Sequence, residues 1–323
     1  MAVALVAELA GAVADRGKSA YNTCNMATLY TQQSKNIRKT WLLMTSFLVL
    51  VIAIGYAVAW YLNNPVIVYI AVAFALVMNI WSYWFSDKLV LRMTNAQPAD
   101  PVQHRELINI VENLAITAGL PMPKVYVVND PAPNAFATGR NPDNAVVAAT
   151  SGLLAMLERN EIEGVMAHEM AHVGNRDMLV MTVAVVLAGF IAILADFLMR
   201  AMWFGGGDNR DRHPAFLIVA IVGIILAPIA AQLIQMAVSR KREYVADATG
   251  ALLTRYPEGL ASALEKISAA GRPMQKASHA TAHLFINDPF GGEQRSVWQK
   301  IGGLFQTHPP ASVRIAKLRE MNM

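Results

Sequence analysis

The chain has 323 residues, of which 55% are hydrophobic and 15% are charged, with a formal net charge of +4. This composition is too apolar for an ordinary soluble protein, and the single cysteine, Cys24, excludes an intramolecular disulfide and a thiolate metal cluster. The basic residues flank apolar runs and form no patch interleaved with aromatics, so we expect no nucleic-acid partner.

The chain begins with an N-terminal tail, residues 1–40. Its first 25 residues have no basic region before their apolar part, so they do not resemble a secretory signal. Met26 stands shortly before the basic cluster that precedes the first apolar run. Residues 1–25 are therefore either an extension upstream of a natural start at Met26 or a weakly amphipathic tail.

Four apolar runs predict transmembrane helices: residues 41–62, 66–85, 178–199 and 215–238. Each has about 20 residues or more, enough to cross a hydrocarbon core of about 30 Å. They pair into a first hairpin, residues 41–86, and a second hairpin, residues 178–238. Because Asp196 and Pro228 make the second pair less apolar, a buried hairpin of a soluble core is the alternative for it.

Basic residues set the expected orientation in the membrane. They precede the first run and follow the second and fourth runs: Lys35, Arg38, Lys39, Lys88, Arg92, Arg240, Lys241 and Arg242. The positive-inside rule then places both termini and the segment between the hairpins in the cytoplasm. We expect a multi-pass protein of the inner or plasma membrane.

The segments outside the hairpins, residues 87–177 and 239–323, predict one small cytoplasmic α+β domain built from two separate pieces. Its expected elements are a helix over 101–120, strands over 124–130, 134–139 and 144–150, helices from 151 and over 160–174, and later helices over 243–253, 259–271 and 309–321. The predicted fold is therefore a helical membrane protein with a small α+β domain at the cytoplasmic face.

The motif HEMAH, residues 168–172, carries the main chemical signal. Residues four apart share one face of a helix, so His168 and His172 can bind one metal ion, with Glu169 as general base on a zinc-bound water. Two buried core histidines on an amphipathic helix are the plain alternative.

The motif EYVAD, residues 243–247, supplies the third ligand that a zinc hydrolase needs. Glu243 can bind the ion, and Asp247 on the same helix face can accept a hydrogen bond from a liganding histidine. The two transmembrane runs between His172 and Glu243 bring both to the same side of the membrane. A solvated charged face is the alternative for this motif.

HEMAH and EYVAD, together with NAFATG (residues 134–139) and THPPASVRI (residues 307–315), resemble the HtpX family of membrane zinc metalloproteases, which is related to the CAAX prenyl endopeptidases. The resemblance runs from about Met26 to the C-terminus. It implies an endopeptidase with one Zn²⁺ per chain, held by His168, His172 and Glu243, that cleaves misfolded or damaged membrane proteins in stress response and quality control. It leaves self-cleavage open.

Other residues have weaker claims to a role in the same reaction. His308 and Arg314 are candidates for stabilising the tetrahedral oxyanion, although Thr307, Pro309 and Pro310 also fit a plain helix start. Residues 134–139 form a candidate edge strand that pairs with an extended peptide, with Asn134 and Phe136 on one face.

Three other classes of protein fit the sequence less well than a membrane metalloprotease does. A zinc-dependent scaffold would not need Glu169. An intramembrane protease would carry its ligands within the transmembrane runs, whereas here they lie at the ends of the runs. A transporter would want more than four transmembrane helices and more intramembrane charge.

Overall fold

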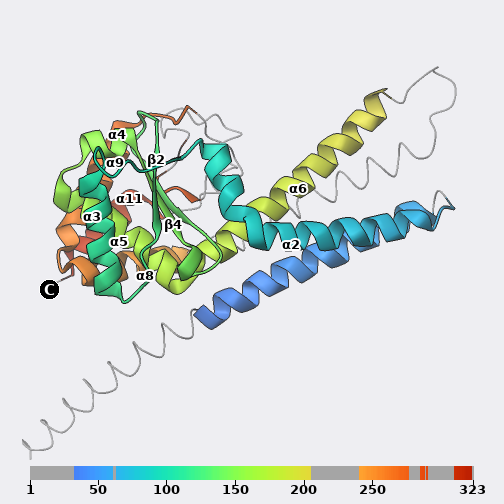
Figure 1. Cartoon of the computed structure of the whole chain (residues 1–323), viewed down its shortest axis with the longest axis horizontal. Coiled ribbons are helices and arrows are strands. Elements are labelled where there is room, and N and C mark those ends of the chain that lie inside the picture. The colour runs from blue at the N-terminus through green and yellow to red at the C-terminus, as the bar shows by residue number, and fades with distance from the viewer. Residues whose placement is uncertain are drawn as a thin grey trace, which may run out of the picture.

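The computed structural model describes residues 33–60, 63–204, 240–275, 284–287, 289 and 309–321, with side chains of the 177–204 helix described as far as Ile191. In this part of the chain a small domain with a mixed sheet carries long helices that project from it (Figure 1). The fourth apolar run, residues 215–238, lies outside the described residues.

The first two apolar runs form long helices, Gln33–Trp60 and α2 (Val66–Thr94), each long and apolar enough to cross a membrane. They lie side by side (Figure 1), and Gly55 meets Ala71 so closely that a Cβ on Gly55 would not fit. Both helices expose large apolar side chains, such as Trp60 and Tyr69. A helix is thus confirmed over each of the first two apolar runs, and both helices are longer than the runs themselves.

The third apolar run lies in α6 (Asp177–Phe204), a helix of 28 residues. Up to Ile191, α6 is long and apolar enough for a membrane span only together with the preceding helix α5 (Arg159–Asn175), from which it is bent by 82°. In the described residues two helices therefore qualify as spans outright, and a third only as a bent pair. The prediction of four spans is thus met in part.

The sheet has four strands in the order β1-β2-β4-β3, namely β1 (Gln97–Pro98), β2 (Lys124–Val128), β4 (Val146–Thr150) and β3 (Ala135–Thr138). β2 and β4 are parallel, and the other two pairs are antiparallel. β4 is buried at all five positions, as a central strand requires. The three predicted strands are confirmed, and the short helix η1 (Pro142–Asn144) connects β3 to β4.

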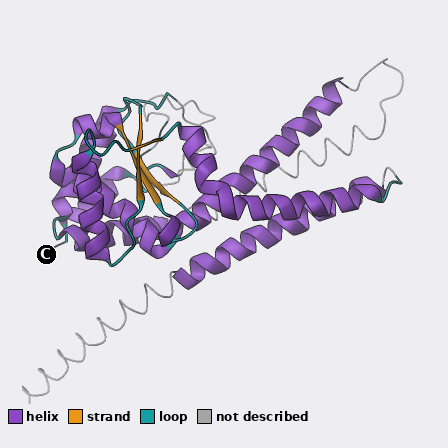
Figure 2. Ribbon diagram, viewed as in Figure 1, coloured by secondary structure: helices purple, strands orange, loops and turns teal. Residues whose placement is uncertain are grey.

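The remaining helices gather beside the sheet (Figure 2): α3 (Arg105–Ala118), α4 (Ser151–Met156), α8 (Arg240–Thr254), α9 (Pro257–Ala270) and α11 (Ala311–Arg319). In α3, Leu107, Ile110, Val111 and Leu114 form the buried stripe that their spacing predicted. α5 packs in the middle of this layer, so its residues are buried on nearly every side.

Candidate metal centre

Local interactions hold the HEMAH helix, α5, in its place. A capping box closes its first turn: Glu161 accepts a hydrogen bond from the backbone N–H of Glu158 at 2.8 Å. Where α8 crosses α5, Gly250 faces the backbone of His168, and a Cβ added there would lie 3.0 Å from the His168 nitrogen. The small residue lets α8 bring its side chains close to those of α5.

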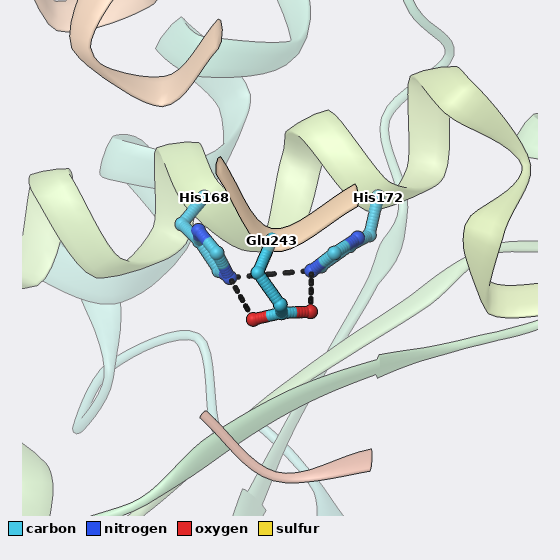
Figure 3. A group of neighbouring side chains, drawn as sticks. All are labelled: His168, His172 and Glu243. Atoms are coloured by element: carbon cyan, nitrogen blue, oxygen red, sulfur yellow. Dashed lines mark hydrogen bonds and ion pairs between the residues drawn. The ribbon is translucent and has the colours of Figure 1, made fainter. Parts of the chain in front are cut away.

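His168, His172 and Glu243 converge on one point between α5 and α8 (Figure 3). The two Nε2 atoms are 3.2 Å apart, and the Glu243 carboxylate lies 3.7 Å from Nε2 of His168 and 3.5 Å from Nε2 of His172. Ligand atoms of a tetrahedral zinc are spaced by about 3.3 Å, which follows from bonds of about 2.0–2.1 Å. The three side chains, all buried, therefore fit one such ion.

Each histidine turns its other nitrogen toward a carboxylate. Nδ1 of His168 is 2.9 Å from Oδ1 of Asp247, and Nδ1 of His172 is 3.2 Å from Oδ2 of Asp177. When both rings are neutral, each Nδ1–H donates a hydrogen bond to its carboxylate, and each Nε2 keeps a lone pair. Those lone pairs face each other and the Glu243 carboxylate, and a cluster of acceptors of this kind favours a cation.

The charges around the two histidines agree with this arrangement. Burial lowers the pKa of His168 to about 4 in spite of its hydrogen bond with Asp247. Burial by itself also lowers the pKa of His172, but Asp177, Glu243 and Glu169 raise it to about 9. The negative field that holds a proton on His172 equally favours a divalent cation, which displaces that proton on binding.

Glu169 lies beside the cluster on α5 and is buried. Burial raises its pKa to about 7, the nearby Glu243 adds to this rise, and His172 opposes it. The backbone N–H of Ala137, on β3, donates a hydrogen bond to its carboxylate. A carboxylate whose pKa lies near neutrality is suited to taking up and releasing a proton.

Asp247 and Arg314 form a buried pair behind His168. Arg314 donates to the carboxylate through Nη2 at 2.6 Å and Nε at 2.9 Å. Burial would raise the pKa of Asp247, but Arg314 and His168 lower it to about 2. Nη1 of Arg314 is also 3.7 Å from Oε2 of Glu243. Of the two oxyanion candidates, Arg314 thus lies beside the cluster, and His308 lies outside the described residues.

The predicted peptide-binding strand is β3, at one edge of the described sheet. Asn134, immediately before β3, accepts a hydrogen bond from the Asn287 N–H at 3.2 Å and donates one to the Asn287 carbonyl at 3.0 Å. Phe136 is buried and packs edge-on against Phe285. Ile286 donates to the Ala135 carbonyl at 3.0 Å, so residues 284–287 cover one end of this edge.

Sequence reasoning missed Asp177. Residues five apart lie about 140° apart round a continuous helix, so an aspartate five positions after His172 gave no sign of contact with it. The available signal was a carboxylate at the very start of the third apolar run, where charge is costly without a partner.

Two histidines, a glutamate and an adjacent buried carboxylate on packed helices are the arrangement typical of a metallopeptidase site. The model of peptidase family M48 matches residues 101–322, and the chain belongs to this family. It is 46% identical over 303 residues to a protease HtpX homolog of Caldanaerobacter subterraneus, covering 92% of this chain and 99% of that one. A protease HtpX homolog of Thermococcus sibiricus is 48% identical over 287 residues, covering 88% and 95%.

Among solved structures, the crystal structure of S. mikatae Ste24p aligns with 90% of this chain and 67% of its own, at 17% identity and a TM-score of 0.49. The relatives identified by sequence confirm the HtpX resemblance and make the chain a metallopeptidase. Its helices Gln33–Trp60 and α2 are each long and apolar enough to cross a membrane.

Proposed function

We propose that the chain is an integral-membrane zinc endopeptidase that hydrolyses misfolded or damaged membrane proteins at the cytoplasmic face. The observation that carries this proposal is that the candidate ligand atoms of His168, His172 and Glu243 all lie within 4.8 Å of one another. The buried Glu169 lies beside them. Two imidazoles and one carboxylate favour zinc over harder cations such as Mg²⁺ or Ca²⁺, which prefer oxygen ligands.

In this proposal His168, His172 and Glu243 hold the zinc, and Asp247 fixes the orientation of His168. Bound zinc lowers the pKa of water and polarises a substrate carbonyl. Glu169 takes a proton from the attacking water onto its carboxylate and then delivers that proton to the leaving amine. Arg314 and His308 stay our candidates for stabilising the oxyanion, and the Arg314 position beside Glu243 supports the first.

Substrate binding is proposed along β3. Backbone groups of an edge strand pair with any extended peptide, which suits a broad range of damaged proteins. The Ala137 N–H already contacts Glu169, so β3 runs past the proposed base. Asn134 and Phe136 hold β3 to residues 284–287, which makes them supports of this strand.

Four transmembrane helices, with the domain boundaries expected from the sequence, complete the proposal. Gln33 and Asn36, at the start of the first membrane helix, bond to Gly174 and Asp177 next to the site. The site thus lies at the membrane surface, and the basic flanks favour the cytoplasmic side. The variant Cys24→Ser, Glu112→Cys, with its one cysteine at an exposed position of α3, tests this orientation: an impermeant maleimide should label it only after cells are permeabilised. Labelling in sealed cells would contradict it.

The experiment for the reaction compares wild type with Glu169→Gln, using detergent-purified full-length protein, an unfolded casein-like substrate and elemental analysis. Glu163→Gln, a partly exposed glutamate of the same helix, is the matched control. We expect wild type and control to cleave, Glu169→Gln to be inactive, and all three to hold about one zinc per chain. Cleavage by Glu169→Gln at the wild-type rate, or wild type without metal, would overturn the proposal.

A further inference from the structure

The contacts of Asp177 link the candidate metal centre to the first membrane helix. We propose that Asp177 is a positioning residue for His172 and that Asn36, on the helix Gln33–Trp60, holds Asp177 in place. This inference rests on the proposed function, because it takes His172 as a metal ligand. It makes the first membrane helix part of the metal centre in addition to an anchor.

A sharp bend brings Asp177 back to His172. α5 ends at Asn175, Arg176 adopts a left-handed backbone with φ of 56°, and α6 starts at Asp177 at 82° to α5. The bend places Oδ2 of Asp177 3.2 Å from Nδ1 of His172. A carboxylate at Nδ1 fixes the ring orientation and keeps Nε2 directed at the metal.

The other oxygen of Asp177 is held by Asn36. The Asn36 amide donates to Oδ1 of Asp177 at 2.7 Å and to the backbone carbonyl of Asn175 at 3.0 Å. Asn36 is 1% exposed, in a turn of the helix whose neighbours Ser34 and Lys35 face outward. One turn away, Gln33 donates to the carbonyl of Gly174 at 2.7 Å. The helix Gln33–Trp60 is thus hydrogen-bonded to the chain on both sides of the bend at Arg176.

Arg242 closes this cluster from the second half of the site. Its Nε lies 3.3 Å from Oδ1 of Asp177, and its Nη1 donates to Oδ1 of Asn36 at 3.3 Å. Arg242 immediately precedes Glu243, the third proposed ligand, on α8. Asn36 therefore contacts Asp177, the partner of His172 on α5. It also contacts Arg242, the neighbour of Glu243 on α8.

The two histidines are supported in parallel ways. Asp247 contacts Nδ1 of His168 and is itself held by Arg314 from α11. In the same way Asp177 contacts Nδ1 of His172. Asn36 and Arg242 hold Asp177. A buried carboxylate that loses a donor turns toward its remaining partners. Without Asn36, Oδ1 keeps Arg242 alone, and the Asp177 carboxylate is no longer fixed against His172.

The test measures cobalt(II) binding by full-length, detergent-purified protein. Competition with a chelator gives the affinity, and the visible d–d spectrum reports ligand geometry. We expect Asp177→Ala to bind cobalt about 10–100-fold more weakly, as loss of such a carboxylate does elsewhere. Asn36→Leu should weaken binding several-fold and change the spectrum. Ser34→Leu, which places the same leucine on the exposed side of the same turn, should match wild type.

The outcomes separate the two proposals. If wild type binds cobalt and Asn36→Leu binds it with unchanged affinity and spectrum, the inference is overturned while the proposed function stands. If wild type binds no cobalt, both are overturned. Should Asp177→Ala fail to fold, the comparison of Asn36→Leu with Ser34→Leu still decides, since leucine favours a helix more than asparagine or serine does at either position.

Discussion

Arg314 and Asp247 form a two-pronged ion pair that is almost completely buried, with side chains 1% and 3% exposed and a shortest distance of 2.6 Å. Both Nε and Nη2 of the guanidinium are used. Asp247 in turn contacts Nδ1 of His168. The last helix of the chain therefore supports a proposed metal ligand of α5 through α8.

Replacing Arg314 by Met should strongly destabilise the protein, because Asp247 is left as an uncompensated buried charge. Breaking a buried pair in this way costs about 3–5 kcal/mol. The stability of Arg314→Lys should lie between those of wild type and Arg314→Met, since an ammonium keeps the charge but cannot reproduce the planar fork of the guanidinium. Thermal unfolding in detergent measures both, and chelator competition should show weaker metal binding for each.

The matched control is Arg319→Met, on the same helix. Arg319 pairs with Glu258 and Glu265, but its side chain is 45% exposed. Solvent screens such pairs, so no measurable change in unfolding or metal binding is expected. Equal effects of Arg314→Met and Arg319→Met would contradict the support role assigned to Arg314.

Gly250→Ala should disturb the crossing of α8 over α5. The added Cβ would lie 3.0 Å from the His168 nitrogen and 3.2 Å from its Cα, and both are backbone atoms that cannot move aside alone. Overpacking of this kind costs about 1–3 kcal/mol. Because Glu243 lies on the same helix, metal affinity should fall together with the melting temperature.

Gly174→Ala provides the comparison for Gly250→Ala. Its Cβ would meet only the Leu120 side chain, at 3.6 Å, an ordinary contact. Alanine also favours the helix over glycine by about 1 kcal/mol. The variant should be as stable as wild type or slightly more so, and loss of metal binding only in Gly174→Ala would refute the proposed importance of the Gly250 contact.

Arg176→Gly tests the bend between α5 and α6. Arg176 has a φ of 56°, a backbone conformation that costs other residues about 1–2 kcal/mol relative to glycine. Glycine should therefore keep the bend, the stability and the metal affinity. Arg176→Ile, with a β-branched side chain at this position, should lose about 1–3 kcal/mol and bind metal more weakly. Wild-type binding by the isoleucine variant would show that the bend does not depend on this residue.

Much of the site could be predicted because it rests on local spacing. His168 and His172 are one turn apart, and Glu243 and Asp247 likewise, so each motif shows its shared face in the sequence. Asp177 could not be predicted, because its contact with His172 depends on the left-handed Arg176. Nor could Asn36, whose partner Asp177 is 141 residues away.

In the fold, too, local patterns predicted the helices, whereas contacts with distant parts of the chain set where some of them end. The second apolar run was predicted to end at residue 85, yet α2 continues to Thr94. Hydropathy falls after residue 85, but Ser86, Val90 and Thr94 continue a buried stripe at intervals of four residues. Packing against the rest of the molecule, which hydropathy alone does not report, extends this helix into the domain.

Glu161 gives a pH-dependent prediction at the start of α5. Its carboxylate accepts hydrogen bonds from Lys266 at 2.8 Å, Ser262 at 2.5 Å and the Glu158 N–H at 2.8 Å. Burial raises its pKa, but these bonds outweigh burial and hold the pKa below its ordinary value of 4.5. The stabilisation from ionised Glu161 is thus fully present above pH 4.5 and is lost as the pH falls below it.

Wild type should therefore be more stable than Glu161→Gln at pH 7, and the difference should shrink as the pH falls below 4.5. The double variant with Lys266→Met isolates the pair: the coupling between the two changes should be favourable at pH 7 and approach zero in acid. Thermal unfolding of the four proteins across this range measures it. A coupling that stays constant with pH would mean that the hydrogen bonds of Glu161 do not depend on its charge.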